Sequence, residues 1–243
     1  MIDPRPPGAV ATVPAGVVVH ALVPAAGRSE RFGGTTPKQF RLLRGRSLLA
    51  WTVRRLLDAG CASVVVALPE EALAEGHGLE LDPRLRLVAG AATRQASVAE
   101  ALAASPAAAH DLVAVHDGAR AALAHSDFAA TLAAAAAARD GAVLGRAPTD
   151  TIKELADGRI VRTVDRALLF RAETPQIFRR ELLERALEAA RRDRFQGTDE
   201  AALVERLGAT EIAAVEARRP NPKVTYPEDL ALVERILAAE SER

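Results

Sequence analysis

The segment at residues 23–40, VPAAGRSERFGGTTPKQF, has the residue types of an anion-binding loop. Its basic side chains are Arg28, Arg31 and Lys38, and its glycines are Gly27, Gly33 and Gly34. Glycine permits backbone conformations that other residues resist, and the small side chains of Ala25 and Ala26 let the main chain approach a ligand closely. Backbone N–H groups, together with Arg31 and Lys38, would form a site the size of a phosphate group. The alternative is a solvated basic loop without a ligand.

Two common phosphate-binding fingerprints are absent from this segment. It lacks the GxxxxGK[ST] pattern of P-loop proteins. It also lacks the GxGxxG pattern of dinucleotide-binding proteins, and no tight helix start follows GRSERFGG. A Rossmann dehydrogenase is therefore disfavoured.

The loop follows the first of several apolar runs that alternate with helical patterns. The runs predict strands at 16–23, 62–69, 85–90, 111–117 and 141–147. Helices are expected at 47–60, 94–105, 126–141, 179–192, 199–207 and 227–239, the first with Ser47 as N-cap and Gly60 at its end. This order indicates βαβ units. The expected fold class is α/β, a Rossmann-like, mostly parallel twisted sheet with helices on both faces.

In such sheets, ligands bind beyond the carboxyl ends of the strands. That rule selects the loop after Val23, the loop after Val88 and the HDGAR segment after Val115. Asp117 follows a buried strand, where an acidic residue without a function is unusual. His116 is instead interpreted as a structural residue at the end of the strand. Residues 147–170 break the pattern, because DGR lies between two short segments with β-branched residues. We expect a β-arm there, projecting from the sheet.

Length and composition limit the other possibilities. The 243 residues suit one large domain, and we expect a flexible tail at 1–16 and a single domain at 17–243. The formal net charge of zero argues against a nucleic-acid surface, and no apolar run approaches the ~20 residues that span a bilayer. The N-terminus does not have the pattern of a signal peptide. Cys61 is the single cysteine, so it is interpreted as a core residue, and the expected location is the cytoplasm.

The opening loop and several later motifs resemble those of a known family. PAAGRSERFGGTTPKQF resembles the signature of the sugar-nucleotide and alditol-phosphate nucleotidyltransferases, and within them the 2-C-methyl-D-erythritol 4-phosphate cytidylyltransferases. The resemblance covers about residues 17–239 and recurs, in order, at GAATRQASV, VHDGAR, TDTIK, TVDR, TPQIF, TDEA and NPKVTYPEDL. The chain departs from the usual family pattern at Ser29, Ala91, Ala92, Ala121, Glu173 and Pro222.

The resemblance implies transfer of a cytidylyl group from CTP to 2-C-methyl-D-erythritol 4-phosphate, with release of pyrophosphate, in the non-mevalonate isoprenoid pathway. The implied catalytic residues are Arg31, Lys38, Arg166 and Lys223. The implied nucleotide-binding residues are Pro24, Ala25, Ala26, Gly27, Gly90, Ala91, Ala92, Ser97, Asp117 and Gly118. Those for the acceptor are Arg120, Thr151, Arg166, Thr198 and Lys223. Backbone groups around 90–92 and the Ser97 hydroxyl are expected to recognise cytosine, since few aromatic residues are present.

The resemblance also implies a cofactor and an assembly. Magnesium would bridge phosphate oxygens, with Asp117 as its protein ligand. In the family the arm is exchanged between two subunits, so a homodimer is implied, with Thr151 and Arg166 reaching the partner's site. The partners expected are therefore CTP, a sugar-alcohol phosphate and a second copy of the chain, without nucleic acid or membrane.

The sequence leaves two other functions open. A ribitol-5-phosphate cytidylyltransferase would share the nucleotide half and differ in the acceptor, but Lys153 after DTI and the TVDR segment favour methylerythritol phosphate. A non-catalytic nucleotide-binding regulatory module would keep the fold without the chemistry. The four cationic residues implied in catalysis argue against it.

Overall fold

The computed structural model describes residues 16–27, 32–33, 36–74, 78–79, 82–208 and 211–241. The strands are β1 (Val19–Pro24), β2 (Leu42–Leu43), β3 (Arg46–Ser47), β4 (Ser63–Leu68), β5 (Leu85–Ala89), β6 (Leu112–Val115), β7 (Ala142–Arg146), β8 (Lys153–Ala156), β9 (Arg159–Thr163), β10 (Arg171–Arg179) and β11 (Ala213–Glu216). The α-helices are α1 (Leu48–Asp58), α2 (Arg94–Ala104), α3 (His125–Ala137), α4 (Arg180–Arg192), α5 (Glu200–Glu205) and α6 (Asp229–Ser241). Short 3₁₀ turns are η1 (Lys38–Phe40), η2 (Glu70–Ala72) and η3 (Arg166–Leu168). The predicted tail at 1–16 lies outside the described residues, apart from Gly16.

A mixed sheet organises the described residues. Its seven strands lie in the order β11-β7-β10-β6-β1-β4-β5. Neighbouring strands are parallel, except that β10 runs antiparallel to both β6 and β7. The prediction of a mostly parallel α/β sheet is confirmed.

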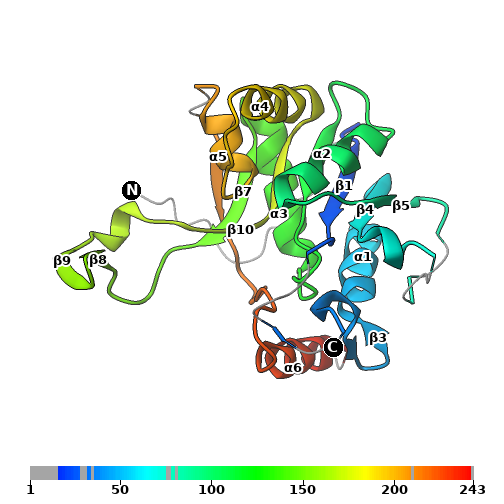
Figure 1. Cartoon of the computed structure of the whole chain (residues 1–243), viewed down its shortest axis with the longest axis horizontal. Coiled ribbons are helices and arrows are strands. Elements are labelled where there is room, and N and C mark those ends of the chain that lie inside the picture. Colours follow the sequence, from blue (N-terminus) through cyan, green and yellow to red (C-terminus); the bar gives the residue numbers. More distant parts are fainter. Residues whose placement is uncertain are drawn as a thin grey trace.

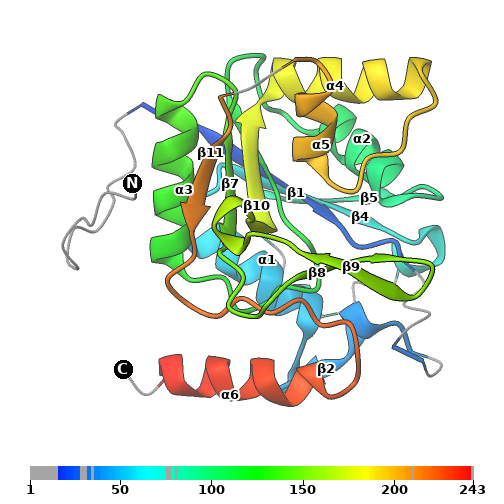
Figure 2. The ribbon, with the colours of Figure 1, turned by 90° about the vertical axis from the view of Figure 1, so that its left-hand side faces the viewer.

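Helices cover both faces of this sheet (Figure 1, Figure 2). One face packs against α1 and α3, through side chains such as Leu56 and Phe128. The other packs against α2, α4 and α5, through side chains such as Leu102 and Leu183. Because successive residues of a strand point to opposite faces, burial of both faces explains the continuous apolar runs of β1 and β4.

The first helix shows how local sequence sets an element's ends. The Ser47 hydroxyl accepts a hydrogen bond from the Ala50 N–H at 3.1 Å, which satisfies one of the backbone donors left over at a helix start. Gly60 follows the helix with φ +89°, a left-handed conformation that glycine adopts without strain. The predicted cap and end of this helix are both confirmed.

A third group of apolar side chains joins α6 to the loops below the sheet. Val233 and Leu237 of α6 pack with Leu43 of the β2–β3 hairpin and with Val224, which lies just before the helix. Figure 2 shows α6 lying beside this hairpin, away from the sheet. The C-terminal segment is thereby held against the loops at the carboxyl ends of β1 and β6.

The segment at 147–170 projects away from the sheet (Figure 1). Its strands β8 and β9 pair antiparallel and are joined at Asp157 and Gly158, which both have positive φ, at 49° and 75°. An Asp-Gly pair in that conformation is the preferred turn of a two-residue hairpin. The hairpin predicted around DGR is therefore confirmed.

Four strands were not predicted from the sequence: the two-residue strands β2 and β3, and the strands β10 and β11 of the large sheet. β10 carries Glu173, Pro175 and Gln176 among its nine residues, so it resembles a loop more than an apolar strand. β11 is a four-residue edge strand of mainly alanine and valine, and is too short to predict from periodicity. The predicted helix at 126–141 ends instead at Ala137, because the chain turns into β7 at Gly141, whose φ is +114°.

Candidate active site

Three loops meet at the carboxyl ends of β1, β5 and β6. A Cβ atom added to Gly90 would lie 2.4 Å from the Cβ of Ala26, and one added to Gly118 would lie 3.1 Å from the Cβ of Ala25. Gly90 is therefore required where the β1 and β5 loops touch, because real Cβ atoms do not approach so closely. The three loops selected from the sequence therefore lie side by side at one edge of the sheet.

Ser97 holds the β5 loop in shape. Its side chain is buried, and its hydroxyl oxygen accepts from the Ala91 N–H at 3.0 Å and lies 2.9 Å from the Thr93 carbonyl. Thr93 in turn caps α2 by accepting from the Ala96 N–H at 3.1 Å. These contacts fix the backbone groups at 90–92 that were predicted to face cytosine. In this structure the Ser97 hydroxyl is used for that support.

Asp117 lies at the centre of a cationic cluster. Its Oδ1 accepts from Arg94 Nε at 3.0 Å, its Oδ2 lies 2.8 Å from Lys223 Nζ, and Arg120 Nε is 3.6 Å from Oδ2. Burial alone would raise the pKa of this carboxyl, but the neighbouring cations, Arg94 first, hold the pKa well below its usual range. Asp117 is therefore ionised across the pH range in which enzymes are normally assayed.

His116 has a structural role beside this cluster. It is fully buried, with Nε2 3.0 Å from the Arg120 carbonyl and Nδ1 3.1 Å from Thr174 Oγ1. Thr174 Oγ1 accepts from the Asp117 N–H at 3.0 Å, so its own proton is available to Nδ1, and Nε2 must carry the proton that reaches the carbonyl. Burial lowers the pKa of His116 to about 4. The neutral ring ties β6 to β10.

The segment 221–224 carries one lysine of the cluster, Lys223, and binds a second, Lys38. Lys223 contacts Asp117, and Lys38 donates from Nζ to the Val224 carbonyl at 2.6 Å. Val224 is itself anchored by its N–H to the Ala119 carbonyl at 2.9 Å. Gln39, next to Lys38, donates to the Ala25 carbonyl at 2.9 Å and so ties η1 to the β1 loop. Residues far apart in the chain thus form one basic site.

Glu173 is the acidic partner of two arginines next to this site. Its carboxylate accepts from Arg146 Nε at 2.9 Å, and Arg120 Nη1 lies 3.6 Å from its other oxygen. Arg120 also donates to the Asn221 carbonyl at 2.7 Å, and the Asn221 amide donates to the Thr174 carbonyl at 3.0 Å. Arg120 therefore links the end of β6 to the 221–224 segment.

One family model matches most of the chain. The sequence model of 2-C-methyl-D-erythritol 4-phosphate cytidylyltransferase matches residues 19–239. The chain belongs to this family. A curated relative of that name from Aeromonas hydrophila is 43% identical over 226 residues, covering 92% of this chain and 91% of the relative. Another, from Aquifex aeolicus, is 36% identical over 222 residues, covering 91% and 99%.

Solved structures agree with the sequence comparison. A crystal structure of 2-C-methyl-D-erythritol 4-phosphate cytidylyltransferase from Thermus thermophilus is 35% identical, with a TM-score of 0.73 and coverage of 90% of this chain and 98% of that one. A crystal structure of 4-diphosphocytidyl-2C-methyl-D-erythritol synthase is 30% identical, with a TM-score of 0.77 and coverage of 91% and 99%. Family membership therefore extends over the whole fold.

Within this cytidylyltransferase, the predicted site residues that the structure describes fall into three groups. One group lies on or beside the loops that meet at the sheet edge: Pro24, Ala25, Ala26, Gly27, Lys38, Gly90, Ala91, Ala92, Ser97, Asp117, Gly118, Arg120 and Lys223. Thr198 lies on the loop before α5. Thr151 and Arg166 lie on the arm, where Arg166 donates to the Thr149 carbonyl. Arg31 lies outside the described residues.

The described residues do not form a protein-held metal site. Among them, no group of three His, Cys, Asp or Glu side chains could hold a metal ion. Asp117 was predicted as the magnesium ligand, but each of its oxygens is engaged by a cationic side chain, so an added cation there would be repelled by Arg94 and Lys223. The surroundings of Asp117 therefore do not fit magnesium bound through this carboxylate.

Two charged residues of the cluster were not predicted. Arg94 joins Asp117 to Glu200, a buried residue at the start of α5. Both residues stand inside motifs that resemble the family, GAATRQASV and TDEA. Nothing in the sequence pairs them, because 106 positions separate them and only the folded sheet brings α2 and α5 together.

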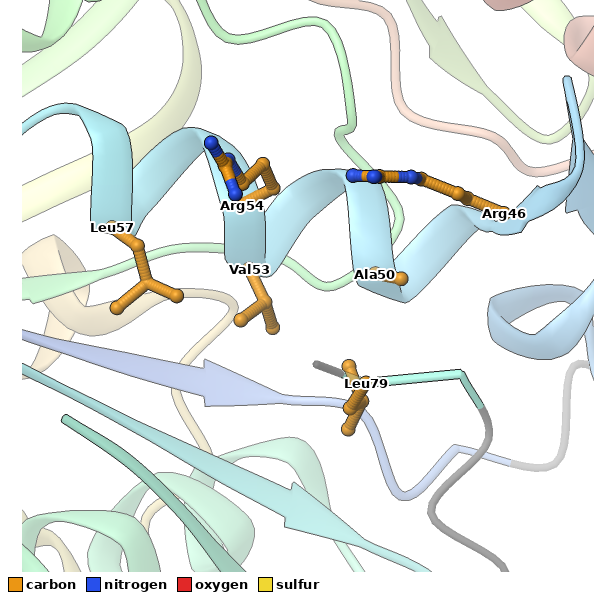
Figure 3. Close-up of a pocket in the computed structure, with 6 residues that line it drawn as sticks. All are labelled: Arg46, Ala50, Val53, Arg54, Leu57 and Leu79. Carbon is orange, nitrogen blue, oxygen red and sulfur yellow. The ribbon is translucent and has the colours of Figure 1, made fainter. Parts of the chain in front are cut away.

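The small pocket in Figure 3 is separate from this site. It lies along α1 and is lined by Arg46, Ala50, Val53, Arg54, Leu57 and Leu79, with a volume of about 10 Å³. That is room for about one water molecule. Within the described part of the chain, every helix is too short or too polar to span a lipid bilayer.

Proposed function

We propose that the chain transfers the cytidylyl group of CTP to 2-C-methyl-D-erythritol 4-phosphate and releases pyrophosphate, in the non-mevalonate synthesis of isoprenoid precursors. The observation that carries this proposal is the gathering of Lys38, Lys223 and Arg120 around the β1, β5 and β6 loops, in a chain that matches this family from residue 19 to 239. Release of pyrophosphate from CTP, measured in parallel with two acceptor phosphates, tests it.

The reaction needs positioned charge more than proton transfer. An oxygen of the acceptor phosphate bonds to the α-phosphorus of CTP, and the bond from that phosphorus to its bridging oxygen breaks, so that pyrophosphate leaves with the electron pair. The acceptor phosphate has its second pKa near ~6 and is mostly dianionic at neutral pH, so no general base is required. Two polyanions must instead be held together in line.

The cationic side chains supply that stabilisation. Lys38 and Arg31 are proposed to contact the triphosphate and the charge that develops on it. Lys223 and Arg120 are proposed to orient the acceptor, each held in place through Asp117 or the 221–224 segment. Arg166 suits bidentate contact with the attacking phosphate. Thr151 and Thr198 would complete the acceptor site with hydroxyl groups.

The nucleotide would lie over the loops after β1 and β5. Gly90 lacks the Cβ atom that would collide with Ala26, and Gly118 lacks one that would crowd Ala25, so the loops pack closely below the ligand. The base is proposed to bind backbone groups at 90–92, whose conformation Ser97 maintains. Magnesium would enter with the triphosphate, whose oxygens are the hard ligands it prefers, and would offset negative charge there.

A homodimer is proposed because the arm is incomplete alone. It exposes large apolar side chains to solvent: Leu155, Ile160, Val161, Leu168 and Phe170. Strands β8 and β9 are exposed along their whole length, which is unusual for a two-stranded ribbon without a covering partner. A second copy would cover these side chains and receive Arg166 at its site. The cytoplasm remains the predicted location, from the cysteine usage.

The pH dependence distinguishes phosphate from histidine as the titrating group. We expect kcat/KM to fall on acidification near pH ~6, where the acceptor phosphate gains a proton and becomes a poorer nucleophile. His116 has a pKa of about 4 and is neutral throughout this range, so His116→Asn should leave the acidic limb in place. The measurement is a pH–rate profile of both proteins, limited to pH values at which both stay folded.

The exposed His125, at the start of α3, supplies the matched control. His125→Asn should not alter the profile. If His116→Asn removed the acidic limb while the variant stayed folded, the histidine would be acting as a base, and the proposed mechanism would be wrong.

A further inference from the structure

Arg94 joins two carboxylates that belong to different elements. Its guanidinium donates to both oxygens of Glu200, from Nη1 at 2.6 Å and from Nη2 at 3.0 Å, and from Nε to Asp117 Oδ1 at 3.0 Å. The Glu200 side chain is only 1% exposed, whereas that of Arg94 is 30% exposed. A planar guanidinium can hold two carboxylates in fixed directions, which a lysine ammonium cannot do.

The contact between Arg94 and Glu200 connects two loops of the site. Arg94 is the first residue of α2 and follows the nucleotide-side loop, and Glu200 is the first residue of α5 and follows the loop that carries Thr198. Gln95 adds two contacts between the same elements, accepting from the Gly197 N–H at 3.0 Å and donating to the Phe195 carbonyl at 3.2 Å. The start of α2 is thus tied firmly to the loop before α5.

Asp117 uses its two oxygens for different partners. Oδ1 is taken by Arg94, and Oδ2 faces Lys223 at 2.8 Å. The last torsion of an aspartate is broad, so one partner alone would let the carboxylate rotate. With Arg94 fixed by Glu200, the carboxylate plane is set, and Oδ2 points at the Lys223 ammonium. The direction of Lys223 therefore depends on Arg94.

We propose that Arg94, held by Glu200, is a positioning residue for the transfer reaction, acting through Asp117 on Lys223. This inference rests on the proposed function, because it assigns Lys223 to the reacting phosphates. Neither Arg94 nor Glu200 needs to touch the substrates. Their effect should appear in turnover more than in nucleotide binding, because a misdirected Lys223 still supplies its charge but no longer at the reacting group.

The test uses Arg94→Gln, Glu200→Gln and the double variant, with kcat and the KM for each substrate. Arg94→Gln should lower kcat at least about tenfold while the KM for CTP changes less than about threefold. It also leaves Glu200 buried without its cation, which could destabilise the fold. The double variant removes both charges and is expected to be as stable as the wild type, with kcat still low.

The double variant therefore separates positioning from simple charge compensation. If Arg94 only neutralised Glu200, the double variant would recover wild-type kcat, and that result would overturn the proposal. Glu200→Gln should lower kcat less than Arg94→Gln does. The decrease in kcat of the double variant should be smaller than the product of the two single decreases, because Glu200 acts through Arg94. If the two decreases in kcat multiplied in the double variant, Arg94 and Glu200 would have independent roles, and that result would also overturn the proposal.

Two further proteins complete the experiment. Arg94→Lys keeps the charge without the planar fork, folds without a buried unpaired acid, and should show a reduced kcat; a full kcat would contradict the proposal. Arg180→Gln is the matched control, because Arg180 is a partly buried arginine that binds the Ser105 and Ala107 carbonyls, away from the cluster, and its kcat should be unchanged. An inactive wild type would refute the proposed function, whereas an active wild type with fully active Arg94 variants would refute this inference alone.

Discussion

Lys38→Ala should lower kcat by about a hundredfold to a thousandfold while changing CTP binding much less. The reason is that the Lys38 ammonium is proposed to meet charge that develops on the triphosphate in the transition state, and removal of one such donor typically costs that much. The measurements are steady-state kinetics of pyrophosphate release and calorimetric titration with CTP. A large drop in kcat with similar CTP affinity indicates stabilisation of the transition state over the ground state.

Lys38 also donates to the Val224 carbonyl, so its loss could act through the fold. A hydrogen bond from a charged group contributes about 1.5–3 kcal/mol, and the melting temperature of the variant will report how much stability was lost. Lys38→Arg retains the charge and should keep part of the activity. Arg54→Ala, which removes an exposed partner of Asp58 on α1, should be neutral. Near-normal turnover of Lys38→Ala would refute the assignment.

Mixing an Arg166→Ala variant with a Lys38→Ala variant should restore activity when their subunits exchange. Arg166 lies on the projecting arm, and Lys38 lies at the sheet edge beside Val224. If each site draws Lys38 from one chain and Arg166 from the other, every heterodimer has one site with both defects and one with neither. Activity should then approach half of the wild-type value per heterodimer.

The alternative is a site completed within one chain. Every site in the mixture would then carry one defect, and no activity would return. Exchange must be shown independently, for example by native mass spectrometry of differently tagged chains. Demonstrated exchange without recovered activity would rule out the shared site, while leaving the transfer reaction itself standing.

Sequence reasoning worked best where local chemistry decides the structure. The cap at Ser47, the left-handed Gly60 and the Asp157–Gly158 turn each follow from the residues present, and all three were found. The loops after β1, β5 and β6 could be placed together because parallel strands bring their carboxyl ends to one edge. These features needed no knowledge of distant contacts.

The parts that sequence reasoning missed depend on long-range pairing. β10 is a strand because β6 and β7 flank it, although its own residues include Glu173 and Pro175. The pairing of Arg94 with Glu200 requires α2 and α5 to pack on the same face of the sheet. The surroundings of Asp117 depend likewise on Lys223, which reaches it only because the 221–224 segment folds back over the β6 loop.

Release of pyrophosphate from CTP, measured in parallel with 2-C-methyl-D-erythritol 4-phosphate and with ribitol 5-phosphate, tests the central claim most directly. The proposal predicts rapid release with the methylerythritol phosphate, at a kcat/KM at least about tenfold above that with ribitol 5-phosphate. It also predicts that the cytidylylated product forms in equal amount to the pyrophosphate. No release with methylerythritol phosphate from folded protein supplied with magnesium, or faster release with ribitol 5-phosphate, would contradict it.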